Sequence, residues 1–174
     1  MSIKLIEHIE ITDPSITSVT LTDGGDWSDY TDLKLVYSAR ISGGSGTYTT
    51  CFLHINGSEQ STGKQLYGTG SSAASHSAFY LYTVNGAATA NTYSNGEIYF
   101  SAPTSTTQHK WYSIDLVNEN NAAATIHLIG AGTYASNTAI SSIGFVPLSG
   151  DVEEGSTFTL FGTTSGSDGT TTVS

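Results

Sequence analysis

Acidic side chains recur at every third position near the start of the chain. Asp23, Asp26, Asp29 and Asp32 lie within eleven residues that also contain Gly24 and Gly25. Because Ca²⁺ takes several oxygen ligands from flexible loops, four carboxylates in one loop could hold that ion. The known calcium loops use a different ligand spacing, however, and aspartate also accepts hydrogen bonds from backbone N–H groups in solvated turns. We favour a solvated turn, with a calcium site at these four residues as the alternative.

Other carboxylates could be sought as a catalytic pair for glycoside hydrolysis. That chemistry needs two carboxyl groups facing each other across about 5–9 Å. Glu153 and Glu154 are adjacent, so in an extended chain they point to opposite faces. Asp115 and Glu119 are the remaining candidates, and their spacing does not define a facing pair. We therefore predict no catalytic residues, and a polysaccharide depolymerase is the least favoured function.

Histidine, cysteine and glycine patterns do not indicate a cofactor. The histidines lack a metal-binding spacing such as an i, i+4 pair, and His54 and His127 fall in expected strands. Cys51 stands beside apolar residues with no basic neighbour in sequence, which indicates a small core residue. The chain has no Gly-x-Ser-x-Gly motif and no phosphate-binding loop ending in Lys-Ser or Lys-Thr. We expect neither a metal nor another cofactor.

Aromatic residues are the remaining candidates for binding. The chain has 10 Tyr and 2 Trp, more than a core of this size requires. Their amphipathic rings suit protein interfaces, platforms for sugars, or half-exposed strands. The candidate partner-binding residues are Trp27, Tyr30, Trp111 and Tyr112, and the three uses remain open.

Period-two alternation of apolar and polar residues indicates the elements that position these side chains. Such runs, bounded by Gly, Ser, Asn and Asp, are typical of an antiparallel β-sandwich or barrel. No apolar stripe keeps helical spacing for three turns, so we expect little or no helix. About ten strands are predicted, at residues 3–11, 16–21, 33–41, 48–56, 79–84, 97–102, 110–118, 124–129, 140–147 and 156–162.

The connections between these runs carry turn signals. Asn56-Gly57, Asn85-Gly86 and Asn95-Gly96 can take positive φ at low cost, and Asn95-Gly96 gives the clearest hairpin prediction. Residues 63–77 are rich in Gly, Ser and Ala and are expected to form an irregular crossing loop. Residues 1–162 are interpreted as one domain, and residues 163–174 as a polar, flexible C-terminal tail.

Composition excludes several classes of partner. The 174 residues carry a net charge of −10 with only 5 Lys and Arg, which argues against binding nucleic acid. A single cysteine cannot form an intramolecular disulfide. No apolar run is long enough to span a membrane, and the N-terminus lacks a signal-peptide pattern. We expect a protein that folds in the compartment where it is made.

Several segments, taken in order, resemble one protein family. These segments are LIE at 5–7, YTDLKLVYSAR at 30–40, NENNAAA at 118–124, IGAG at 129–132, ISSI at 140–143 and GSTFTLFG at 155–162. They resemble small β-sandwich virion surface proteins of tailed bacteriophages, especially marine and cyanobacterial phages. The acidic loop from Asp23 to Asp29 and the residues beyond Gly162 depart from that pattern. The resemblance implies a jelly-roll fold, a homotrimer, and no assigned catalytic residues.

Two functions follow as expectations from the composition and the resemblance. The first is a non-enzymatic decoration or knob-like subunit on a phage capsid or tail, in contact with itself and with other virion proteins. The alternative is a tail or head fibre module that recognises host surface glycans. In both cases the protein would be assembled in the bacterial cytoplasm and displayed on the virion surface.

Overall fold

The computed structural model describes residues 2–22, 24, 27–43, 46–68, 73–76, 79–119, 121 and 126–164. These ranges form an all-β structure and contain no α-helix, as the alternation predicts. The strands are β1 (Ser2–Glu10), β2 (Val19–Leu21), β3 (Asp32–Ile41), β4 (Tyr48–Ile55), β5 (Ser58–Glu59), β6 (Gly63–Gly68), β7 (Ala73–His76), β8 (Leu81–Asn85), β9 (Ser94–Ser101), β10 (Lys110–Asn118), β11 (His127–Tyr134), β12 (Ile143–Pro147) and β13 (Thr157–Thr164).

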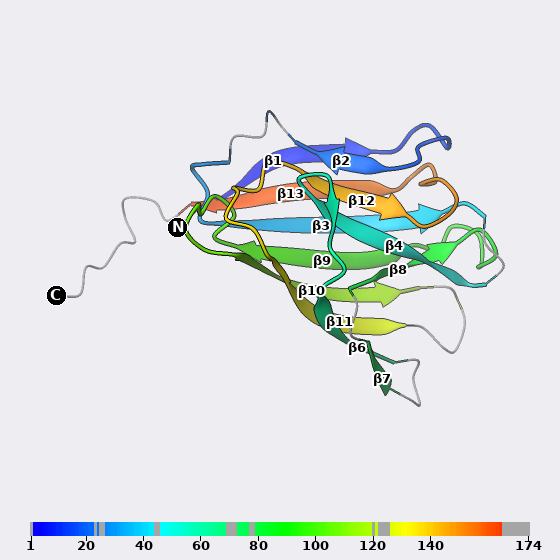
Figure 1. Cartoon of the computed structure of the whole chain (residues 1–174). Coiled ribbons are helices and arrows are strands. Elements are labelled where there is room, and N and C mark those ends of the chain that lie inside the picture. The colour runs from blue at the N-terminus through cyan, green and yellow to red at the C-terminus, as the bar shows by residue number, and fades with distance from the viewer. Residues whose placement is uncertain are drawn as a thin grey trace.

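The strands are arranged in two layers (Figure 1). The larger layer has the order β1-β13-β3-β9-β10-β11-β6-β7, and the smaller layer has the order β2-β12-β4-β8, with β5 paired to β4. One strand pair departs from the antiparallel arrangement that the sequence predicts. Arg40 and Ile41 of β3 run parallel to Val84 and Asn85 of β8. Because β3 is ten residues long, its last two residues reach the smaller layer and connect the two into one mixed sheet.

The core lies between the two layers. The ring centroid of Phe145 in β12 is 5.3 Å from that of Tyr37 in β3 and 5.0 Å from that of Phe158 in β13. These contacts join the smaller layer to the larger one. Each fully buried ring contributes about 1.5–3 kcal/mol relative to exposure. The described buried apolar residues between Ile11 and Leu160, apart from Val84, form one contiguous cluster.

Two tyrosines in this core cover glycines on the neighbouring strand. Tyr37 lies opposite Gly96 and Tyr112 opposite Gly132. A Cβ atom at Gly96 would come within 2.6 Å of the Tyr37 ring. The predicted hairpin at Asn95-Gly96 is therefore wrong, because both residues belong to β9 and Gly96 leaves room for the tyrosine.

Residues 63–77 also differ from expectation. Instead of one irregular loop, this segment contains β6 and β7, and β6 pairs with β11 in the larger layer. Its Gly, Ser and Ala content suggested a loop, but close strand pairing also accepts small residues. At Gly63, for example, a Cβ atom would lie 2.8 Å from the carbonyl oxygen of Ala131.

The two ends of the described chain lie side by side at the edge of the larger layer. Ile3 pairs with Thr163 and Ser2 with Thr164, and the Ser2 and Thr164 hydroxyl groups are 2.7 Å apart. The expected tail from residue 163 therefore begins too early, because Thr163 and Thr164 complete β13. The rest of that prediction, residues 165–174, lies outside the described residues.

Candidate binding surface on the larger layer

The outer face of the larger layer carries the side chains that could do chemistry. Along β9 and β10 the exposed positions alternate with core positions. Asp115 lies opposite Glu97, Ser113 opposite Tyr99, and Trp111 opposite Ser101. Along the outer face of β9 and β10, Trp111 and Tyr99 thus form an aromatic end, and Asp115 and Glu97 form an acidic end.

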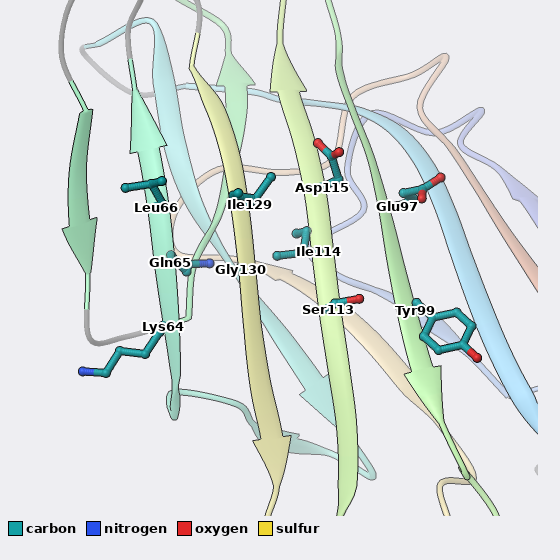
Figure 2. Close-up of a pocket in the computed structure, with 10 residues that line it drawn as sticks. All are labelled: Lys64, Gln65, Leu66, Glu97, Tyr99, Ser113, Ile114, Asp115, Ile129 and Gly130. Carbon is teal, nitrogen blue, oxygen red and sulfur yellow. The ribbon is translucent and has the colours of Figure 1, made fainter.

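This face is hollowed over four strands. A hollow of about 600 Å³ lies over β6, β11, β10 and β9. In Figure 2, Leu66, Ile129, Asp115 and Glu97 project from these strands in one row, as their register requires. The full lining is Lys64, Gln65, Leu66, Glu97, Tyr99, Ser113, Ile114, Asp115, Ile129 and Gly130.

A second hollow continues the first toward β3 and β13. It has a volume of about 480 Å³ and shares Glu97 and Asp115 with the first. Its far side is formed by Val36 of β3 and by Thr157 and Thr159 of β13. The two hollows together make a shallow track that crosses the strands, with the two carboxylates at its middle.

The carboxylates have unequal surroundings. The Lys34 ammonium group lies 2.6 Å from Glu97 Oε2. The Asp115 carboxylate has no ion pair or hydrogen bond with the described residues. Like charges directly opposite on antiparallel strands destabilise a sheet. At the middle of the track, the Asp115 carboxylate is therefore a negatively charged hydrogen-bond acceptor without a partner among the described residues.

Two aromatic side chains lie along the same strands. Trp111 is 66% exposed and Tyr99 is 44% exposed. Partial burial, a hydrogen bond to Asp32 and the charge of that carboxylate together raise the pKa of Tyr99 to about 12. Tyr99 is therefore a neutral phenol at physiological pH, with its hydroxyl group held toward β3.

The predicted acidic loop is described only in part. Asp23 and Asp26 lie outside the described residues, while Asp29 is exposed. Asp32 is half-buried and accepts a hydrogen bond of 2.9 Å from the Thr31 hydroxyl group. Across the described ranges, no three His, Cys, Asp or Glu side chains lie close enough together to hold a metal ion. Calcium binding by the complete loop stays a prediction.

Two of the four candidate aromatic residues are buried, and a third is partly covered. Trp27 and Tyr112 are each 2% exposed and belong to the core, so proposing them as partner-binding residues was wrong. Tyr30 is half-buried and covers Gly162. These rings fill space over glycines or within the core instead of facing a partner. Trp111 is the candidate that the fold leaves exposed.

Two of the carboxylates considered for catalysis have partners of their own. Glu153 forms an ion pair of 2.8 Å with Arg40, and the Glu119 carboxylate accepts a hydrogen bond from the Asn121 N–H group. Asp115 faces Glu97, a residue that sequence reasoning missed. Alternation along each strand places both outward, but their juxtaposition depends on the register between β9 and β10.

The lone cysteine fits the core role that the sequence indicates. Cys51 is fully buried, and burial raises the pKa of its thiol to about 12. Such a thiol is protonated and unreactive at neutral pH.

Within the described ranges, no helix has the length and apolar character needed to cross a membrane. No protein-family model, no curated protein and no solved structure matches the chain.

Proposed function

We propose that the chain is a non-enzymatic structural subunit displayed on the virion surface of a tailed phage, attached to the capsid or tail and associating with copies of itself as a trimer. The resemblance of its strand segments to phage virion surface proteins supports this proposal. So does the sheet face described above, which offers surface for contact but lacks a buried, convergent acid–base pair among the described residues.

The proposal includes a jelly-roll fold. In favour of it, strands β1-β13-β3-β9 face strands β2-β12-β4-β8. Along the chain, β1, β2, β3 and β4 alternate between the layers, and β8, β9, β12 and β13 do so again. Eight strands in two Greek keys wrap in this way. Strands β10, β11, β6 and β7 then extend the larger layer beyond the jelly roll.

The observation that carries the assembly role is the edge of the larger layer. Within the described residues, β1 pairs with β13 along one side and has no strand along the other. Ile3 is 73% exposed and Leu5 is 59% exposed. Long edge strands with exposed apolar side chains tend to recruit a further chain. A neighbouring subunit would cover both the strand edge and these side chains.

The edge also suits attachment in many copies. Each contact would bury a few side chains and be weak, but repeated contacts on one particle reinforce one another. Leu5 lies in register with Phe161 of β13, which is half-buried. These side chains form a small apolar patch that two subunits could share.

Light scattering on the purified chain tests the proposal directly. We expect an oligomer at micromolar concentration that Leu5→Lys converts to monomer. Leu148→Lys serves as the matched control, since Leu148 is 64% exposed and lies outside β1. A wild-type chain that stays monomeric and does not bind purified particles contradicts the assembly role. Particle reconstruction then distinguishes decoration, with hundreds of copies, from a fibre tip with a dozen or fewer.

A further inference from the structure

We propose that the track on the outer face of β9 and β10 is a binding site for a neutral saccharide. Tyr99 in the lining and Trp111, which lies beyond the lining two residues along β10 from Ser113, would stack against sugar rings. The Asp115 carboxylate would accept hydrogen bonds from sugar hydroxyl groups. This site is separate from the β1 edge, so the inference does not depend on the proposed assembly role.

The dimensions of the track suit an extended ligand. The two hollows cross six neighbouring strands, from β6 to β13. At about 4.8 Å between strands, this distance is roughly 24 Å. The hollows are shallow, and small residues such as Ser113 and Gly130 lie in the floor. An oligosaccharide lying across the strands, with one sugar ring reaching along β10 to Trp111, fits this shape better than a compact ligand.

The aromatic end provides a platform for a sugar ring. Trp111 and Tyr99 are diagonal neighbours on adjacent strands, within reach of large side chains. The two faces of a pyranose ring carry C–H groups, which pack on an indole ring, while the rim carries hydroxyl groups. Trp111 is two-thirds exposed, which leaves a ring face open to solvent for that contact.

The acidic end provides the polar partners. A carboxylate accepts hydrogen bonds at both oxygen atoms, and bonds from hydroxyl groups to a charged oxygen are stronger than neutral ones. Adjacent hydroxyl groups on a sugar ring can donate to one carboxylate together. At Asp115 they would supply the donors that the described residues do not. They would also lessen the repulsion between Asp115 and Glu97.

Charge selects among the possible occupants. The chain has a net charge of −10. Asp115, Glu97 and Asp32 lie on this face, where Lys34 is paired with Glu97 and Lys64 lines the β6 side of the first hollow. An acidic saccharide would meet these carboxylates unfavourably. A second copy related by a two-fold axis would bring the same carboxylates against each other and bury an unpaired charge. A neutral ligand rich in hydroxyl groups avoids both costs.

An array of neutral and acidic oligosaccharides, probed with the intact chain, tests the proposal. We expect binding to neutral members, followed by titration calorimetry with the strongest of these. Loss of one hydrogen-bonded carboxylate or one stacking ring should weaken binding about tenfold. The test variants are Asp115→Ala and Trp111→Ala. The matched controls are Glu59→Gln and Tyr48→Ala, an exposed carboxylate and an exposed aromatic residue away from the track.

Three results would overturn the proposal. One is no binding to any neutral oligosaccharide on the array. Another is binding restricted to acidic members. The third is unchanged affinity in Asp115→Ala and Trp111→Ala. Both side chains are exposed, so the variants should fold, and matching circular dichroism spectra would show that a loss of binding arises at the site.

Discussion

Arg40 is a buried cation that connects three parts of the chain. It is 5% exposed, and its Nε atom lies 2.8 Å from Glu153 Oε2. Its other guanidinium nitrogens donate to the carbonyl oxygens of Ala88, Thr89 and Thr92, at 3.2, 2.9 and 3.1 Å. The end of β3 is thereby tied to the loop after β8 and to the segment before β13.

Replacing this group is expected to be costly. Arg40→Met removes the cation beside the Glu153 carboxylate and the guanidinium donors to the Ala88 and Thr92 carbonyls, so we expect a loss of about 3–5 kcal/mol in unfolding free energy. Lys34→Met is the control, because its ion pair with Glu97 is exposed and such pairs contribute less than about 1 kcal/mol. Urea unfolding measures both. Equal losses would show that the Arg40 network does not stabilise the fold.

Gly132 provides a second test at the level of one residue. A Cβ atom there would lie 2.4 Å from the Tyr112 ring. That ring is held against Phe79 at 4.7 Å, and its hydroxyl group donates to the Thr62 carbonyl at 3.1 Å. Gly132→Ala should therefore destabilise the fold by about 1–3 kcal/mol. Gly46→Ala is the control, with its nearest atom at 3.7 Å, and thermal melting should separate the two.

The role of a residue can be predicted from the sequence where the alternation of apolar and polar residues along one strand determines its burial. The apolar neighbours of Cys51 predict a core position, and the residue is buried. For Trp27 and Tyr112 the sequence is ambiguous, because aromatic type alone does not distinguish a core ring from an exposed one. Their burial depends on partners distant in sequence, such as Gly132 beneath Tyr112.

At the scale of elements, Gln65 fixes β6, one side of the hollow. Its side chain is 2% exposed. It donates to the Tyr80 carbonyl at 2.7 Å and accepts from the Tyr80 N–H group at 2.9 Å. This pair of bonds ties β6 to the chain entering β8, much as a further strand would.

Removing that pair should loosen one element. Gln65→Leu leaves both Tyr80 backbone groups without their side-chain partner, which costs about 1–3 kcal/mol for each buried group. We expect faster amide hydrogen exchange in β6 and at its partner positions in β11. Gln60→Leu is the control, because Gln60 is also buried but donates to Ser58 within its own turn. Unchanged exchange in Gln65→Leu would contradict this role.

The same dipeptide had two outcomes, which shows what limits element prediction. Asn56-Gly57 joins β4 to β5 with φ values of 51° and 77°, as its sequence predicts for a tight hairpin. Asn95-Gly96 has the same residue types but continues β9. Tyr37 on the neighbouring strand occupies the space beside Gly96. A glycine required by a tertiary contact cannot be distinguished from a turn glycine by local sequence.

At the scale of the whole molecule, the all-β class was predictable and the candidate site was not. Alternation identified the long strands, and β10 matches its predicted bounds. The facing of Asp115 and Glu97 depends on how β9 and β10 pair, and the hollow depends on β6, which was interpreted as a loop. The amino-acid pattern of each strand does not determine the register between β9 and β10, so the sequence alone does not predict the site.

The whole fold should also lose stability at alkaline pH. Burial raises the pKa of the Cys51 thiol to about 12 and, with the nearby tyrosines, that of Tyr82 to about 12. Burial raises the pKa of Tyr37 and Tyr112 further. In the unfolded chain these groups lose their protons near pH 9–10. The folded chain then binds more protons than the unfolded chain, so stability falls as pH rises from about 9 toward 12.

Lys110 acts in the opposite direction but is a single group. Desolvation lowers the pKa of its ammonium group, so its contribution rises with pH until about 10.5, its ordinary value. Counting Tyr99, five raised groups against one lowered group leave a net fall in stability, with up to about 1.4 kcal/mol per pH unit from each fully buried proton. Urea midpoints at pH 8, 9, 10 and 11 should decrease, and Tyr112→Phe should make the decrease shallower. Because Lys110→Met removes the opposing contribution, it should make the decrease steeper. A urea midpoint that stays constant from pH 9 to 11 would show that the protons on the buried tyrosines and Cys51 do not stabilise the fold.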